Sequence, residues 1–161
     1  MNWKEYIETQ LNLNNVSKYR CNSPATQEVL IALKERFELS HLPDELEELY
    51  RQTDGIDELL YFEEKGELTK TGELIWQIEK VIETNNTCRT APYFKDIYKP
   101  LDQLLFISDA GNGDMFGYKT INGKFDGSDI YVWDHEDDSR NWVAPNLTKF
   151  IEGWTNGRIT I

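Results

Sequence analysis

Two short polar runs hold most of the side chains that could do chemistry. The first is DAGNGD at residues 109–114, whose glycines and side-chain oxygens could cradle a phosphate or a calcium ion. A phosphate-binding loop needs a helix after its glycines, whereas the strand-like MFGYK follows here. A calcium loop needs oxygen ligands at alternating positions, and Asp109 and Asn112 do not keep that spacing. The run is therefore predicted to be a tight turn between two strands, in which Gly111, Asn112 and Gly113 tolerate positive φ.

The second run is WDHEDDS at residues 133–139, which surrounds His135 with four acids. Such a histidine could ligate a metal or act as a general base, with its pKa raised by the neighbouring carboxylates. However, neighbouring residues on a strand point to opposite faces, so these acids cannot all converge on one ion. The only other histidine, His41, is remote in sequence. A solvated acidic strand end is the favoured interpretation, and a metal-dependent enzyme centred on His135 is a weaker alternative.

The sequence contains no motif of nucleophilic catalysis. G-x-S-x-G is absent, and neither Cys21 nor Cys88 has a nearby histidine or a metal-like spacing. A disulfide between the two cysteines stays an open alternative, but the favoured interpretation is two reduced thiols in a cytosolic protein. The N-terminus has no apolar signal-peptide core, and no run reaches the roughly 18 apolar residues of a membrane span. We therefore expect a cytoplasmic protein with no enzymatic activity, cofactor or metal.

The charge of the chain restricts its partners. The 161 residues carry 17 Lys and Arg against 29 Asp and Glu, a formal net charge of −12. Such a chain should be repelled by nucleic acid and by anionic membranes, and attracted to basic proteins. The excess lies in residues 44–64, net −8, and in residues 102–138, net −7. These segments are either two solvated faces or, if the fold brings them together, one acidic docking surface.

The hydrophobic pattern predicts which elements position these runs. Expected helices cover residues 2–11, 24–39 with Ser23 as N-cap, 43–54 before Gly55, 77–86, and 144–154. Expected strands cover residues 58–62, 72–76, 104–108, 115–119 and 130–134. The order predicts an α+β fold with a largely antiparallel sheet covered by helices on one side, and DAGNGD as the reversal between residues 108 and 115. Trp76 and Trp133 are expected in the core, and Gly55 and Gly113 in left-handed positions that the fold requires.

The ordered set of motifs resembles the SUKH superfamily, named partly for the yeast Smi/Knr cell-wall regulators. The pieces that carry the resemblance are LPDELEELYRQTDGI (42–56), LIWQIEKVIETN (74–85), LLFISDAGNGDMFGY (104–118), IYVWDHEDDSRNWVA (130–144) and LTKFIEGW (147–154). The resemblance runs from about Ser23 to Trp154, so residues 1–22 form an N-terminal helical extension, and residues 87–100 match poorly.

This resemblance implies one SUKH-like domain over residues 1–161, with its antiparallel sheet packed against N-terminal helices and a C-terminal helix. It also implies a binding protein, since the family is not known for enzymes. In bacteria its members are commonly immunity proteins that neutralise polymorphic toxins, many of them nucleases, and in eukaryotes related domains are regulatory modules. The motif positions map onto Asp109, Gly111, Asn112, Gly113, Asp114, Trp133, Asp134, His135 and Glu136.

Together these inferences predict an immunity protein that binds a basic, nuclease-type toxin through an acidic surface. The alternative is an intracellular regulatory or scaffold domain of the same fold, and the oligomeric state stays open. The expected contact residues are Asp134, Glu136, Asp137 and Asp138, with His135, and with Asp109 and Asp114 at the neighbouring turn. Weaker members are Asp54, Asp57 and Glu58 from the other acidic segment. If these residues make no contact, the interface is expected in residues 87–100.

Overall fold

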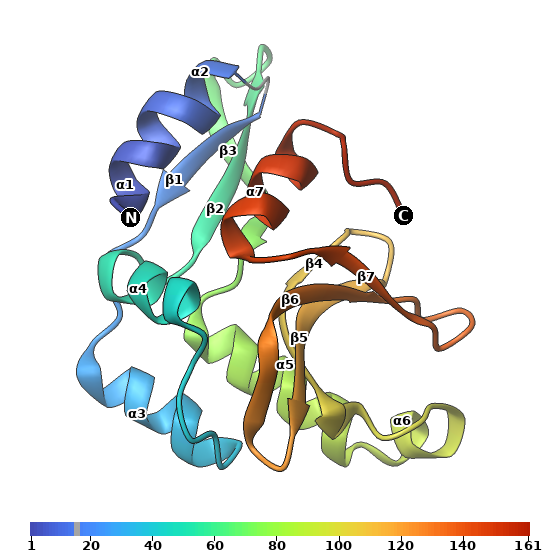
Figure 1. Cartoon of the computed structure of the whole chain (residues 1–161). Helices are drawn as coiled ribbons and strands as arrows, with labels where there is room; N and C mark the ends of the chain where they lie inside the picture. The colour runs from blue at the N-terminus through green and yellow to red at the C-terminus, as the bar shows by residue number, and fades with distance from the viewer. Residues whose placement is uncertain (15–16) are drawn as a thin grey trace.

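A computed structural model describes residues 1–14 and 17–161 (Figure 1), and its strands lie in two antiparallel sheets with helices around them. The helical elements are α1 (Trp3–Tyr6), the π-helical turn η1 (Ile7–Leu11), α2 (Asn12–Asn14), α3 (Gln27–Arg36), α4 (Asp44–Gln52), α5 (Ile78–Thr90), α6 (Pro92–Ile97), the 3₁₀ turn η2 (Leu101–Gln103) and α7 (Leu147–Thr155). The strands are β1 (Lys18–Cys21), β2 (Ile56–Phe62), β3 (Glu67–Ile75), β4 (Leu104–Asp109), β5 (Met115–Ile121), β6 (Lys124–Trp133) and β7 (Arg140–Ala144). The predicted α+β class is confirmed.

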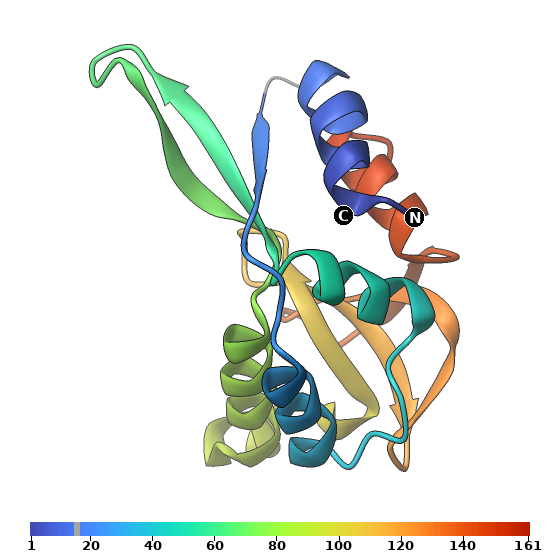
Figure 2. The same ribbon diagram turned by 90° about the vertical axis from the view of Figure 1, so that its left-hand side faces the viewer.

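Sheet A consists of β1, β2 and β3 in that order. Its β2–β3 hairpin stands away from the rest of the molecule, and residues 60–70 of this hairpin are here called the arm (Figure 2). Large apolar side chains on the arm are exposed, namely Leu60, Tyr61, Phe62 and Leu68. Nearer to the rest of the molecule the side chains of this hairpin are buried: Ile56 pairs with Ile75, and both are inaccessible to solvent. The arm thus carries apolar surface that the described part of the chain does not cover.

Sheet B consists of β4, β5, β6 and β7 in sequence order, so each strand pairs with the next. DAGNGD forms the reversal between β4 and β5, as predicted. Two hydrogen bonds at the end of β3 join the sheets: the backbone Trp76 N donates to Ile107 O at 2.9 Å, and the side-chain Ser108 Oγ donates to Leu74 O at 2.7 Å. The buried side chains of both sheets form one continuous cluster.

Helices cover both faces of sheet B, which corrects the expectation of a single covered face. Phe116 on β5 packs against Phe150 and Trp154 of α7, with ring centroids 4.8 and 4.9 Å apart. The side chain of Met115, next to Phe116 on β5, points to the opposite face of the sheet. Trp133 on β6 pairs in register with Met115 and therefore lies on that opposite face, where it contacts Phe94 of α6. On both faces, therefore, aromatic side chains of the sheet pack against a helix.

Several element boundaries differ from the predicted ones. The helix after Pro24 begins later, at Gln27, because the Thr26 hydroxyl rather than Ser23 accepts a hydrogen bond at the helix start, from Val29 N. The helix expected to end at residue 86 continues to Thr90, and α6 follows in the segment without a clear period. The short strands β1 and β7 were not predicted. No helix among the described residues has the length and apolar character to cross a membrane.

Candidate functional site

The two polar runs lie side by side at one end of sheet B. Met115, the first residue of β5, pairs with Asp109 on β4 and with Trp133 on β6, so the turns beyond these residues are neighbours. We call this region the acidic end: Asp109, the β4–β5 turn at 110–114 and the β6–β7 turn at 134–139. The structure thus brings together seven predicted contact residues: Asp109, Asp114, Asp134, His135, Glu136, Asp137 and Asp138.

A histidine–aspartate pair connects the two turns. Asp114 Oδ1 lies 2.7 Å from His135 Nδ1 and accepts a second hydrogen bond from His135 N at 3.1 Å. The hydrogen bond to Asp114 raises the pKa of His135. Burial acts to raise the pKa of Asp114, but the hydrogen bonds from His135 and Asn112 outweigh it and hold that pKa below its ordinary value. Both pKa shifts therefore favour the charged forms of the two side chains, and the resulting ion pair holds one turn against the other.

Asp138 anchors the β6–β7 turn from inside. Its carboxylate accepts hydrogen bonds from Trp133 Nε1 at 2.8 Å, from Lys99 N at 2.9 Å and from Arg140 at 3.3 Å. Its φ of 60° lies in the left-handed region, which aspartate tolerates better than most residues. Because these donors occupy the carboxylate, Asp138 supports the turn rather than presenting a charge to solvent.

The adjacent acids do face solvent. Glu136 and Asp137 are exposed, whereas Asp134 is half-buried. The hydrogen bonds at these carboxylates are local: Asp134 Oδ1 accepts from Glu136 N at 2.7 Å, and Asp137 Oδ1 accepts from Ser139 N at 2.8 Å. Both bonds tighten the turn without neutralising its charge. Glu136 and Asp137 are thus the carboxylates that a partner can reach on this turn.

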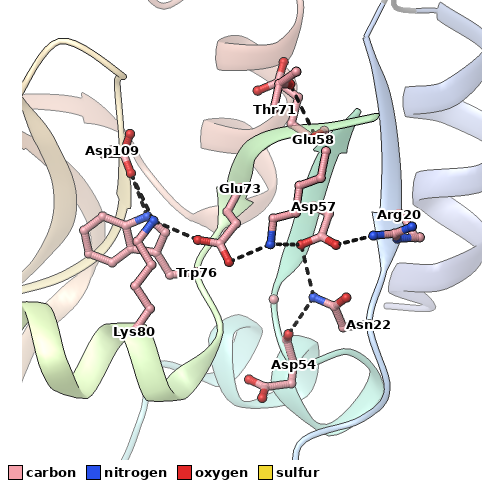
Figure 3. A network of polar contacts seen from close by, with 12 residues as sticks. Arg20, Asn22, Asp54, Asp57, Glu58, Thr71, Glu73, Trp76, Lys80 and Asp109 are labelled. Atoms are coloured by element: carbon pink, nitrogen blue, oxygen red, sulfur yellow. Dashed lines mark hydrogen bonds and ion pairs between the residues drawn. The ribbon is translucent and has the colours of Figure 1, made fainter. Parts of the chain in front are cut away.

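The acids of the other segment are embedded in a polar network (Figure 3). Asp57 is 3% exposed and forms ion pairs with Arg20 at 2.9 Å and Lys70 at 2.8 Å. Asp54 accepts a hydrogen bond from Ile78 N at 2.8 Å and so caps α5, although its burial raises its pKa. Both acids stabilise the fold through bonds within the chain.

The network continues through Glu73 and Lys80 to Asp109, which also accepts a hydrogen bond from Trp76 Nε1 at 2.8 Å. Glu58, on β2 beside Asp57, is half-buried. Lysine and arginine therefore neutralise most of the charge where the two acidic segments approach each other. Of the ten predicted contact residues, only Glu136 and Asp137, both on the β6–β7 turn, are exposed.

A metal site was the alternative for His135, and three ligand atoms do lie close together. Asp114, Asp134 and His135 each offer one such atom, all within 4.8 Å of one another. However, Asp114 already accepts hydrogen bonds from His135 and Asn112, and Asp134 already accepts one from Glu136 N. Both carboxylate oxygens of Asp114 thus already bond within the chain, and the geometry of the two turns accounts for the close approach of the three groups.

A histidine that activates a nucleophilic side chain of the protein must lie within hydrogen-bond reach of it. Among the described residues, the hydrogen bonds of His135 involve only Asp114 and Tyr98, whose hydroxyl donates to His135 O at 2.8 Å. Cys88 lies on the neighbouring α5, and burial raises its thiol pKa to about 11, which disfavours the reactive thiolate.

No sequence pattern pointed to the residues that hold the acidic end in place. Tyr98 and Lys99 come from the segment without a clear period, and Arg140 lies beyond the acidic run, yet all three bind the β6–β7 turn. Only the tertiary fold brings them there.

The described part of the chain is a two-sheet α+β scaffold with accessible polar groups on strand-connecting turns, and loops on a rigid scaffold commonly carry binding or catalytic residues. Residues 24–153 match the SMI1 / KNR4 family (SUKH-1), and because this match covers most of the chain, the protein belongs to that family. The resemblance to the SUKH superfamily is confirmed, and the family consists in general of non-catalytic binding domains. No curated protein matches the sequence.

Proposed function

We propose that this protein is an immunity protein that binds and neutralises a basic, nuclease-type toxin in the cytoplasm, with the acidic end as its contact surface. A nuclease must present basic residues to its phosphodiester substrate. A rigid acidic surface can occupy such a site and accelerates the encounter by electrostatic attraction.

The observation that carries the proposal is the way in which Glu136 and Asp137 are displayed. Both carboxylates are exposed on a turn that Asp138 and the His135–Asp114 pair hold in place from either side. A turn that is already fixed loses little conformational entropy when a partner binds, which favours affinity. The net charge of −12 adds long-range attraction to any basic partner.

The direct test uses the protein encoded beside this one, purified in a catalytically inactive form. We expect a stable complex, and we expect protection of cells that produce the active toxin; binding without protection would favour the regulatory alternative. The double variant Glu136→Lys/Asp137→Lys should lower the association rate constant by roughly tenfold at low salt, because it reverses the charges nearest the partner. Asp138 is left intact so that the turn stays folded.

A matched control separates local contact from overall charge. Glu63→Lys/Glu64→Lys makes the same change in net charge at exposed positions of the arm. We expect this variant to lower the association rate constant by less than about twofold, because these charges lie far from the proposed contact. Equal rate constants for the native protein and the Glu136/Asp137 variant would contradict the acidic end as the contact surface.

A further inference from the structure

A pocket opens beside the acidic end, between α5, α6 and the two turns. Its volume is about 650 Å³, and Gly113 and His135 form the border that it shares with the acidic end. Most of its remaining lining comes from α5 and from residues 93–98. A concave site of this size with mixed apolar and polar walls is typical of ligand recognition.

One wall of this pocket is a row of four aromatic rings. Tyr93 and Phe94 lie 4.7 Å apart between ring centroids, Phe94 and Tyr98 5.8 Å, and Tyr98 and Trp133 4.9 Å. Trp133 and Phe94 are also in contact, at 6.3 Å. Trp133 is fixed by its bond to Asp138 and Tyr98 by its bond to His135 O, so the inner part of the wall is already ordered. Tyr93 at the mouth is 59% exposed.

The charges around the pocket leave one carboxylate without a counterion. The two cationic side chains of the lining are compensated, because Lys80 pairs with Glu73 and Asp109 and His135 pairs with Asp114. Glu83, on the α5 side of the lining, is exposed and has no hydrogen bond or ion pair with any residue that the structure describes. The pocket therefore combines aromatic faces with a net negative edge.

We propose that this pocket receives an arginine side chain of a protein partner, with its guanidinium stacked on the aromatic row and paired with Glu83. A guanidinium is planar, weakly hydrated and always charged, so it can stack on aromatic rings and bond a carboxylate at the same time. An apolar occupant would remove Glu83 from water without offering a donor, which is costly. The identity of the partner rests on the proposed function, whereas the chemistry of the pocket does not.

The pocket can be tested without the partner, by NMR titration with N-acetyl-arginine amide. We expect saturable shifts of the Trp133 indole signal and of the backbone signals at 83–88 and at Gly113, with a dissociation constant on the order of millimolar for so small a ligand. N-acetyl-citrulline amide has the same shape without the charge and should bind at least threefold more weakly. Shifts of equal size for both ligands, or none at these residues, would overturn the inference.

Two variants locate the binding energy. Glu83→Gln should weaken N-acetyl-arginine amide by about two- to fivefold, as expected for an exposed ion pair, and Tyr93→Ala should weaken it by a similar factor. Glu79→Gln is the matched control, since Glu79 is an exposed acid one turn earlier on α5 that lies outside the pocket lining. If Glu79→Gln weakened binding as much as Glu83→Gln does, the interaction would be general charge attraction and the inference would be wrong. Tighter binding of N-acetyl-tyrosine amide than of N-acetyl-arginine amide would assign an aromatic occupant to the pocket instead.

The same variants separate this inference from the proposed function. If the toxin binds, Glu83→Gln and Tyr93→Ala should accelerate its dissociation by at least threefold, because anchors in a pocket act mainly on the dissociation rate. If N-acetyl-arginine amide binds but the toxin does not, the proposed function fails and the pocket stands. If the toxin binds with a dissociation rate that neither variant changes, the arginine pocket is wrong and the proposed function stands.

Discussion

At the scale of single residues, the His135–Asp114 pair connects stability to pH. The bond to Asp114 raises the pKa of His135, so the folded chain holds the imidazolium more tightly than the unfolded chain does. This stabilisation is fully present below the ordinary histidine pKa of about 6.5 and is lost as the pH rises through the higher pKa of the folded state.

Thermal unfolding between about pH 5 and about pH 9 measures this effect. The melting temperature of the native protein should exceed that of His135→Asn most at the acidic side, and the difference should shrink as the pH rises. His135→Asn keeps a neutral donor for Asp114 but does not titrate in this range. A difference that is the same at every pH would mean that the imidazolium contributes nothing to the fold.

Two adjacent acids should respond differently to the same substitution. Asp138→Ala should lower the free energy of unfolding by about 2–3 kcal/mol, because it leaves the indole of Trp133 and the amide of Lys99 without an acceptor. Asp137→Ala should change it by less than about 0.5 kcal/mol, as is usual for an exposed side chain. Asp138→Asn keeps an acceptor and the positive φ, and should fall between the two in urea unfolding. Equal losses at the two positions would refute the anchoring role.

Sequence reasoning located the acidic run but could not distinguish these neighbours. Asp137 and Asp138 have the same chemistry and adjacent positions, and they differ only in what the fold places beside them. The partners of Asp138 include Lys99, 39 residues earlier in the chain. The same reason explains why Asp57, a predicted contact, turned out to be buried between Arg20 and Lys70.

At the scale of elements, Gly55 and Gly113 both have positive φ, at 81° and 110°. A Cβ atom on Gly55 would lie 2.8 Å from the backbone at Gln77 N and Ile75 O, whereas the atoms nearest to one on Gly113 belong to the His135 ring, the first at 2.9 Å. Backbone atoms between paired elements cannot withdraw, but a side chain can rotate. The two glycines therefore constrain the fold to different degrees.

We expect Gly55→Val to lower the free energy of unfolding by more than about 3 kcal/mol, from left-handed strain combined with a clash. Gly113→Val should cost about 1–2 kcal/mol, which is mainly strain. The loss should appear in thermal melts whether or not a partner is present. A Gly113 variant with native stability and weakened binding would show instead that this glycine acts in binding and does not constrain the fold.

The elements predicted best are those whose pattern reflects their own burial. The strands β4 and β5, the last part of β6 (130–133) and the turn at 109–114 were correct because apolar and aromatic runs separated by glycines admit few other structures, whereas β6 begins at Lys124 instead of the predicted residue 130. The strands β1 and β7 were missed because each has only four or five residues and contains charged ones, and pairing with a neighbouring strand, rather than a hydrophobic pattern, makes them strands. No pattern in the sequence indicated a role for Asn85 either. Its side-chain amide donates to Phe106 O and accepts from Phe106 N, and so attaches α5 to β4.

At the scale of the whole molecule, the net charge of −12 predicts how association depends on salt. Exposed charges are screened beyond about 8 Å at physiological ionic strength, so electrostatic attraction weakens as salt is added. We expect the association rate constant with a basic partner to fall by at least about tenfold between roughly 0.02 and 0.5 M NaCl. Stopped-flow fluorescence or surface plasmon resonance measures this, and the dissociation rate should change less. A rate constant that does not depend on salt would contradict electrostatic attraction as the driving force of association.

The arm has a consequence for how the chain tolerates change. Its apolar side chains are exposed and the continuous buried cluster does not reach its tip at 63–66, so the body does not depend on that tip for its own packing. The amide protons of the tip should exchange with solvent long before those of sheet B, which report global unfolding. A flexible peptide inserted between Lys65 and Gly66 should leave the melting temperature nearly unchanged. The tip of the arm is thus the place where this chain can accept new sequence without losing its fold.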